Sequence, residues 1–170
     1  VSHDRARCVV GDGGGGAPQP PPVAGPPDRI GQLCDWINTD HTDGLSKAYM
    51  HPLIKAIILH FAIGYEHPFH DGNGRVARSL FYWFMFKKGF SAFRYIAIST
   101  LLKKAPIQYG KSYLYTETDG MDLTYFLDYQ CRVLARAISK FTETYEKTAQ
   151  SIMEFNAFLF QSGLYNKLSE

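Results

Sequence analysis

One stretch of twelve residues, from His67 to Arg78, combines the groups that a phosphoryl or nucleotidyl transfer site needs; it reads His-Pro-Phe-His-Asp-Gly-Asn-Gly-Arg-Val-Ala-Arg. Histidine exchanges a proton most readily near neutral pH, so His67 could accept one from an attacking hydroxyl. Asp71 offers the hard oxygen ligand that magnesium takes alongside phosphates. Arg75 and Arg78 are three residues apart, so both could hold phosphate oxygens from one face of a helical turn.

A tight turn at the centre of this stretch should form an anion site. Gly72 and Gly74 permit backbone angles that other residues resist, which lets several N–H groups point at one place. A helix is expected from Asn73 onward. Its first N–H groups and the positive end of its dipole would then favour a bound phosphate.

Two helices should position the turn. Apolar residues before it recur at three- and four-residue spacing and predict a helix over 53–66; they are Leu53, Ile54, Ile57, Ile58, Phe61 and Tyr65. Pro68 should end that helix, because proline disfavours helical conformation in the residue before it, here His67. The second helix is expected over 76–89, with a buried stripe formed by Val76, Leu80, Trp83 and Phe84.

The stretch resembles the motif H-x-F-x-[DE]-G-N-G-R-x-x-R of the Fic family and matches it without substitution. The resemblance implies a protein adenylyltransferase that moves AMP from ATP to a Ser, Thr or Tyr hydroxyl of a target protein. In that family His67 would be the general base, Asp71 would hold magnesium, and Phe69 would be a buried anchor for the loop. The phosphates would be bound by Gly72, Asn73, Gly74, Arg75 and Arg78.

Other functions stay open at this point. Relatives transfer UMP, phosphocholine or phosphate, or remove AMP, and the motif does not select the donor. A non-catalytic binding module is a further alternative. The joint presence of His67, Asp71 and both arginines argues against it, because a binding platform needs none of them.

The resemblance also implies the architecture, which is a mainly α, Fic-type helical bundle with a short β-hairpin flap near the N-terminus. We expect an extension at 1–7, the Fic domain at 8–145 and a C-terminal helical extension at 146–170. The flap would occupy 8–23 and bind the target protein as an added strand. The glycines and prolines of this segment are equally typical of a flexible linker.

The remaining segments predict further helices. Ile30 to Asn38 should form a core helix capped by Asp28. Two more are expected over 95–102 and 106–115, the second carrying Tyr109 and Tyr113. In related proteins a tyrosine-bearing helix lines the nucleoside pocket, so Tyr109 is a candidate for the adenine side; ordinary core tyrosines are the alternative.

From residue 123 on, apolar side chains alternate at four- and three-residue spacing: Leu127, Cys131, Leu134, Ile138, Phe141 and Tyr145. They predict one long amphipathic helix, or two in series, whose far end would overhang the domain. Such a helix could connect to something outside this chain or pair with a second copy in a homodimer.

Two regulatory or metal alternatives find little support. A zinc cluster of His60, His67 and His70 would need a continuous helix or strand, which Pro68 interrupts. The family's inhibitory pattern [ST]-x-x-x-E-[GN] is approached at Ser139 and Thr142, but neither is followed by the required glycine or asparagine.

Composition limits the partners and the compartment. A net charge of +2 is too small to argue for a nucleic-acid groove or an anionic membrane surface. The longest apolar run, 80–86, is far shorter than the ~20 residues of a membrane span. Three scattered cysteines without metal-ligand spacing indicate a reduced, cytoplasmic protein.

Overall fold

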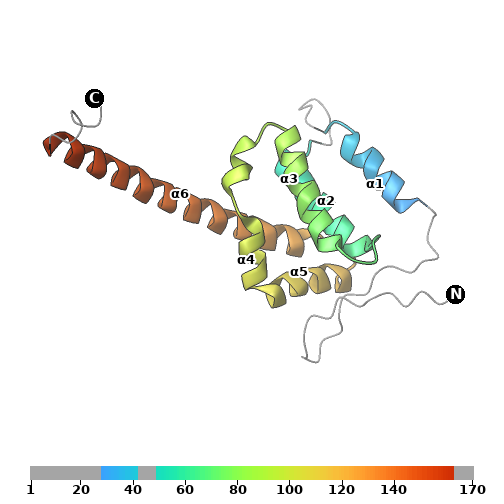
Figure 1. Cartoon of the computed structure of the whole chain (residues 1–170). Helices are drawn as coiled ribbons and strands as arrows, with labels where there is room; N and C mark the ends of the chain where they lie inside the picture. The colour runs from blue at the N-terminus through green and yellow to red at the C-terminus, as the bar shows by residue number, and fades with distance from the viewer. Residues whose placement is uncertain (1–27, 42–48, 163–170) are drawn as a thin grey trace.

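The computed structural model describes residues 28–41 and 49–162, which form six α-helices, one 3-10 helix and no strand. In chain order these are α1 (Arg29–Asn38), α2 (Pro52–Glu66), α3 (Asn73–Lys87), η1 (Ser91–Tyr95), α4 (Ile98–Lys104), α5 (Pro106–Thr118) and α6 (Thr124–Gln161). The mainly α class is therefore confirmed for this part of the chain (Figure 1). The predicted flap at 8–23 lies outside the described residues.

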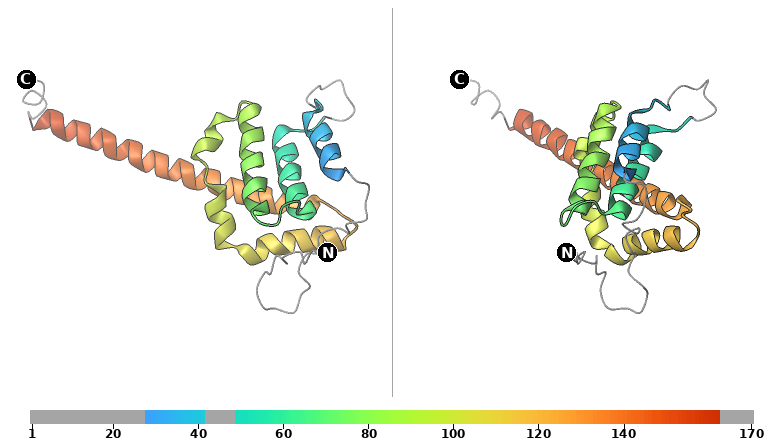
Figure 2. Two further views of the ribbon diagram at one scale, coloured as in Figure 1. Left: turned by 45° about the vertical axis from the view of Figure 1, so that its right-hand side comes forward. Right: turned by 90° about the vertical axis from the view of Figure 1, so that its right-hand side faces the viewer.

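Helix α2 is the centre of the bundle and lies between α1 and α3 (Figure 2). It is apolar around most of its circumference and also contacts α6, so most of its length is buried. Its fully buried side chains include Ile57, Phe61 and Ala56. The predicted helix at 53–66 is confirmed, with Pro52 at its first position and His51 as its N-cap.

The buried face of α3 differs from the predicted stripe. Phe84 is buried as expected, but Trp83 is 46% exposed, and the core positions are Ala77, Phe81 and Met85. Helix α3 packs on α2 along one side only. Trp83 lies just beyond that side, where the Lys87 ammonium sits 5.0 Å from its ring centroid. Hydrophobic spacing thus placed the helix correctly and one large side chain on the wrong face.

Helix α1 begins after Asp28, whose carboxylate accepts a hydrogen bond from the backbone N–H of Gly31, as predicted. The prediction that it is a core helix was only partly right. Only Ile37 is buried, whereas Ile30 is 38% exposed and Cys34 is exposed. Among the described helices, α1 packs mainly against α2, which leaves much of its surface exposed in this part of the chain.

A buried lysine joins the end of α1 to α2. Lys55 is 3% exposed, and its Nζ donates to the carbonyl of Thr39 at 2.5 Å and lies 2.9 Å from Nδ1 of His41. The same ammonium lies 5.1 Å from the ring centroid of Trp36. Burial lowers the pKa of Lys55 from its ordinary value, and the positive charge of Lys88 adds to that effect.

Helix α6 is a single helix of 38 residues, and the overhang predicted from its pattern is confirmed (Figure 1). All of its buried side chains fall in its first half; they are Phe126, Gln130, Val133, Leu134 and Ala137. Beyond Ala137 no described side chain of α6 is buried, although the ring of Phe141 still stacks on that of Tyr95. No helix in the described ranges has the length and apolar character needed to cross a bilayer.

Candidate active site

His67 occupies the end of α2 in a conformation that its neighbours impose. Its backbone is left-handed, with φ 48° and ψ 51°. Gly64 would normally receive a helical hydrogen bond from the backbone of residue 68, but that residue is proline and has no N–H. The imidazole fills this gap, because Nδ1 of His67 lies 3.2 Å from the carbonyl oxygen of Gly64.

This contact selects the tautomer of His67. A carbonyl oxygen can only accept a hydrogen bond, so Nδ1 carries the proton and donates it to Gly64. The lone pair of the neutral ring then lies on Nε2. A histidine held in this way has the nitrogen that a general base requires free for an incoming hydroxyl.

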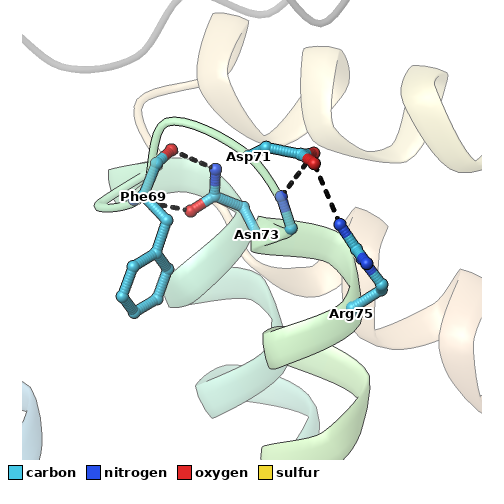
Figure 3. Close-up of polar contacts among 5 residues, drawn as sticks. Phe69, Asp71, Asn73 and Arg75 are labelled. Atoms are coloured by element: carbon cyan, nitrogen blue, oxygen red, sulfur yellow. Dashed lines mark hydrogen bonds and ion pairs between the residues drawn. The ribbon is translucent and has the colours of Figure 1, made fainter.

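The loop between α2 and α3 is held by Asn73 (Figure 3). The Asn73 Oδ1 accepts from the N–H of Phe69 at 2.9 Å, and its Nδ2 donates to the carbonyl of Phe69 at 2.6 Å. Asn73 is 3% exposed. Both polar atoms of this predicted phosphate ligand are therefore engaged in shaping the loop.

Phe69 itself is not the buried anchor that the resemblance implied. Its side chain is 48% exposed and points away from the loop backbone (Figure 3). The Asn73 amide already fixes the position of the Phe69 backbone from the interior side. The ring is consequently free to lie on the surface beside the site.

Asp71 lies at the outer edge of the turn. Its Oδ1 accepts from the N–H of Gly72 at 2.6 Å, and its Oδ2 pairs with Nη2 of Arg75 at 2.9 Å (Figure 3). The carboxylate side chain is 84% exposed and that of Arg75 is 74% exposed. Both charges are therefore accessible to a ligand, and water screens their mutual attraction.

The anion site was predicted at the N-terminus of α3. Gly72 caps it with φ 86°, a left-handed angle that glycine adopts without strain, and no side chain in the described part of the chain accepts from its first N–H groups. Both arginines fold back over this end. A Cβ added to Gly74 would lie 3.2 Å from Nη1 of Arg78, and one added to Gly72 would lie 3.5 Å from Nη2 of Arg75. Two guanidinium groups thus lie against the positive end of the helix dipole.

Behind the loop lies a buried cluster that sequence reasoning did not identify. His60 is 3% exposed, its Nε2 lies 3.0 Å from the Tyr109 hydroxyl, and its ring meets Phe81 and Phe126 edge-on. Burial lowers the pKa of His60 to about 3, and the nearby charge of Arg78 contributes. His60 is therefore neutral at physiological pH. The signal in the sequence was its place on the buried side of α2, between Leu59 and Phe61.

Tyr109 belongs to this cluster. Its hydroxyl also lies 3.3 Å from that of Tyr113, and its ring packs near Phe126 and Tyr129. Tyr113 is 5% exposed. Tyr109 itself is only partly buried, and its role as an adenine ligand stays a prediction. The structure brings His67, Asp71, Arg75 and Arg78 together around one turn and places Tyr109 in the layer behind them.

Comparison with known proteins agrees with this geometry. Residues 5–85 match the model of the Fic/DOC family. This part of the chain is a Fic/DOC family domain, and it is distantly homologous to protein adenylyltransferases.

Protein adenylyltransferase fic-1 of Caenorhabditis briggsae is 36% identical over 63 residues, which cover 37% of this chain and 11% of that protein. The fic-1 protein of Caenorhabditis elegans is 35% identical over 63 residues, with the same coverage. Protein adenylyltransferase Fic of Drosophila ananassae is 34% identical over 55 residues, or 32% of this chain and 10% of that protein. The matched segments thus span about a tenth of these relatives. No solved structure gave a significant match.

Proposed function

We propose that this chain is a protein adenylyltransferase that transfers AMP from ATP to a Ser, Thr or Tyr hydroxyl of a target protein. The observation that carries the proposal is the hydrogen bond from Nδ1 of His67 to Gly64, which leaves Nε2 as a base beside an arginine-flanked helix N-terminus. The similarity to protein adenylyltransferases supports the same reaction.

The reaction balances with the groups present. The target hydroxyl gives its proton to Nε2 of His67, and its oxygen forms a new bond to the α-phosphorus of ATP. The bond from that phosphorus to the bridging oxygen breaks, and pyrophosphate leaves. The N–H groups at the start of α3, with Arg75 and Arg78, would stabilise the charge on the phosphates. A positioned base contributes ~10²–10⁴ in rate, and alignment supplies much of the rest.

Asp71 fits the role of magnesium ligand that the family assigns to this position. Magnesium usually binds through one or two carboxylates together with substrate phosphates and water. Asp71 supplies one exposed carboxylate next to the proposed phosphate site, and each of its oxygens has a lone pair beyond the bond that it already accepts. When bound, the ion would offset negative charge on the phosphates.

The decisive experiment follows label from ATP carrying radioactive α-phosphate into the protein itself and into a cell lysate. His67→Ala should lower the transfer at least ~100-fold, because it removes the base. His70→Ala is the matched control, since His70 is an exposed histidine of the same loop and should leave transfer unchanged. Transfer that survives in His67→Ala would overturn the assignment of the base.

The donor is tested in parallel. ATP with labelled γ-phosphate, UTP and CDP-choline are offered under the same conditions, and the proposal expects label only from α-labelled ATP. Label from one of the others would reassign the transferred group. Absence of transfer from every donor, with no rise in melting temperature on adding ATP and magnesium, would favour a non-catalytic binding module.

A further inference from the structure

Helix α6 carries a row of side chains at heptad spacing along most of its length, including the half that projects from the domain. We call this row the heptad line. Positions spaced alternately by three and four residues are apolar with one exception from the domain to the helix end; they are Leu127, Cys131, Leu134, Ile138, Phe141, Tyr145, Thr148, Ile152, Phe155 and Leu159. The exception is Thr148. Such spacing is the pattern by which two helices pack side by side as a coiled coil. We name residues 138–161 the overhang.

Within the described residues, the bundle covers this line only as far as Phe141, whose ring stacks on that of Tyr95. Ala137 is 7% exposed where α6 leaves the domain, whereas its neighbour Ile138 is already 45% exposed. Farther out, Tyr145 is 65%, Ile152 56% and Phe155 59% exposed. The left view of Figure 2 shows that the far end of α6 projects well beyond the other helices. The heptad positions nearest the domain, Leu127, Cys131 and Leu134, pack in or against the core, whereas most of those from Ile138 outward are exposed.

We propose that the heptad line of the overhang is covered by the same line of a second copy of this chain, which makes the protein a homodimer. In such a dimer the two heptad lines would meet along a contact that we call the seam. Identical helices repel one another if like charges flank this contact. The positions that flank this seam are uncharged, and they are Thr142, Thr144, Ala149, Ser151, Asn156 and Phe158. Every charged residue of the overhang lies on the other side of the helix: Lys140, Glu143, Glu146, Lys147 and Glu154. Two copies can thus meet without bringing like charges together.

The one polar position in the seam is compatible with burial. The Thr148 hydroxyl donates to the carbonyl of Thr144 within its own helix at 2.9 Å. No unsatisfied hydroxyl would be left when a partner covers it. Tyr145 is long enough to bury its ring while its hydroxyl reaches water at the rim.

The exposed area is also sufficient. Phe155, Phe158, Tyr145, Ile152 and Ile138 are each about half exposed, which leaves on the order of 100 Å² per side chain. The five together supply roughly 500 Å² from each copy. A specific interface needs about 1,000 Å² counted over both partners, so two overhangs reach that size.

Sedimentation equilibrium of the 170-residue chain tests the dimer. The expected mass is twice the 19.2 kDa of one chain at micromolar concentration. Ile152→Glu with Phe155→Glu should return the mass to one chain and raise the dissociation constant at least ~100-fold, because each seam would then bury four carboxylates. The matched control is Gln150→Glu with Ala157→Glu, which adds the same charges on the opposite face and should remain a dimer.

Thermal unfolding of the monomeric variant provides the folding check, since both substituted side chains lie outside the core and the bundle should stay folded. A chain that remains monomeric at ~100 µM would overturn the proposal and assign the face to another protein or to a different segment. A dimer that persists in the seam variant, or that is lost equally in the control, would overturn it as well.

Discussion

Asn73→Ala should loosen the loop that carries the proposed catalytic groups. The substitution removes two hydrogen bonds to the backbone of Phe69, at 2.9 and 2.6 Å, from a side chain that is 3% exposed. At about 1 kcal/mol for each neutral hydrogen bond, the free energy of unfolding should fall by about 2 kcal/mol. For a chain of this size that loss corresponds to a decrease of about 4–8 °C in Tm.

Activity should fall together with stability. Asp71 lies in the chain between Phe69 and Asn73, the two residues that these hydrogen bonds join. A loop that shifts by about 1 Å would therefore misplace it, and such a shift can cost on the order of 10²-fold in rate. Thermal unfolding followed by circular dichroism measures the first effect, and AMP transfer at saturating ATP measures the second. Asn38→Ala is the control, because it removes an exposed amide whose two partners, the carbonyl of Cys34 and the ammonium of Lys87, both lie in exposed contacts. Its effect should stay within about 0.5 kcal/mol.

A loss of ATP binding without a loss of stability would refute this reasoning. If Asn73→Ala melts within ~1 °C of the unaltered protein but no longer binds ATP, the amide acts on the nucleotide. The resemblance assigns Asn73 to the phosphate cradle, and that assignment would then hold directly. The hydrogen bonds to Phe69 would be incidental to stability.

Three further predictions concern buried groups. The folded protein holds the pKa of His60 at about 3 against an ordinary 6.5, so the unfolded chain binds one proton more below pH 6.5. Stability should therefore be intact above pH 6.5 and fall by about 1.4 kcal/mol per pH unit below it, and urea unfolding of His60→Gln should lack this part of the slope. Gly64→Ala should cost about 1–3 kcal/mol, because the added Cβ would lie 2.2 Å from the Tyr113 hydroxyl; Tyr113→Phe in the same chain should restore part of the loss, and no restoration would contradict the clash. Lys55→Ala should speed hydrogen exchange in α1 by freeing the Thr39 carbonyl, whereas unchanged exchange would show that Lys55 does not hold α1.

The helices on either side of the site could be predicted because their signals are local. Pro68 ends α2 and Gly72 permits the left-handed cap of α3, and each acts through the backbone of its immediate neighbours. The anion site at the start of α3 follows from the same turn. Chemistry and spacing within one short stretch were enough to define it.

Side-chain assignments that depend on distant segments were less predictable. Tyr109 was a nucleoside candidate by its position, yet its hydroxyl lies against His60, which comes from another helix. Trp83 fitted the helical spacing of a buried residue, but it is 46% exposed among the residues that the structure describes. Apolar periodicity shows which face of a helix is the most apolar, but it does not show how many faces are buried against other elements.

The sequence by itself determined the family motif, the two helices that present it, and the amphipathic stretch that overhangs the bundle, because turn residues and apolar spacing act over a few residues. That this stretch is one helix and not two in series was decided by the structure. Only the tertiary structure decided that the Asn73 amide fastens the loop, that Phe69 lies on the surface, and that His60 is buried beside Tyr109. Each of these outcomes depends on which polar groups lack a partner once the helices have packed. A buried polar group forms its hydrogen bond with a residue that is near it in the folded structure. That residue can be far away in the sequence, so the order of residues alone does not identify it.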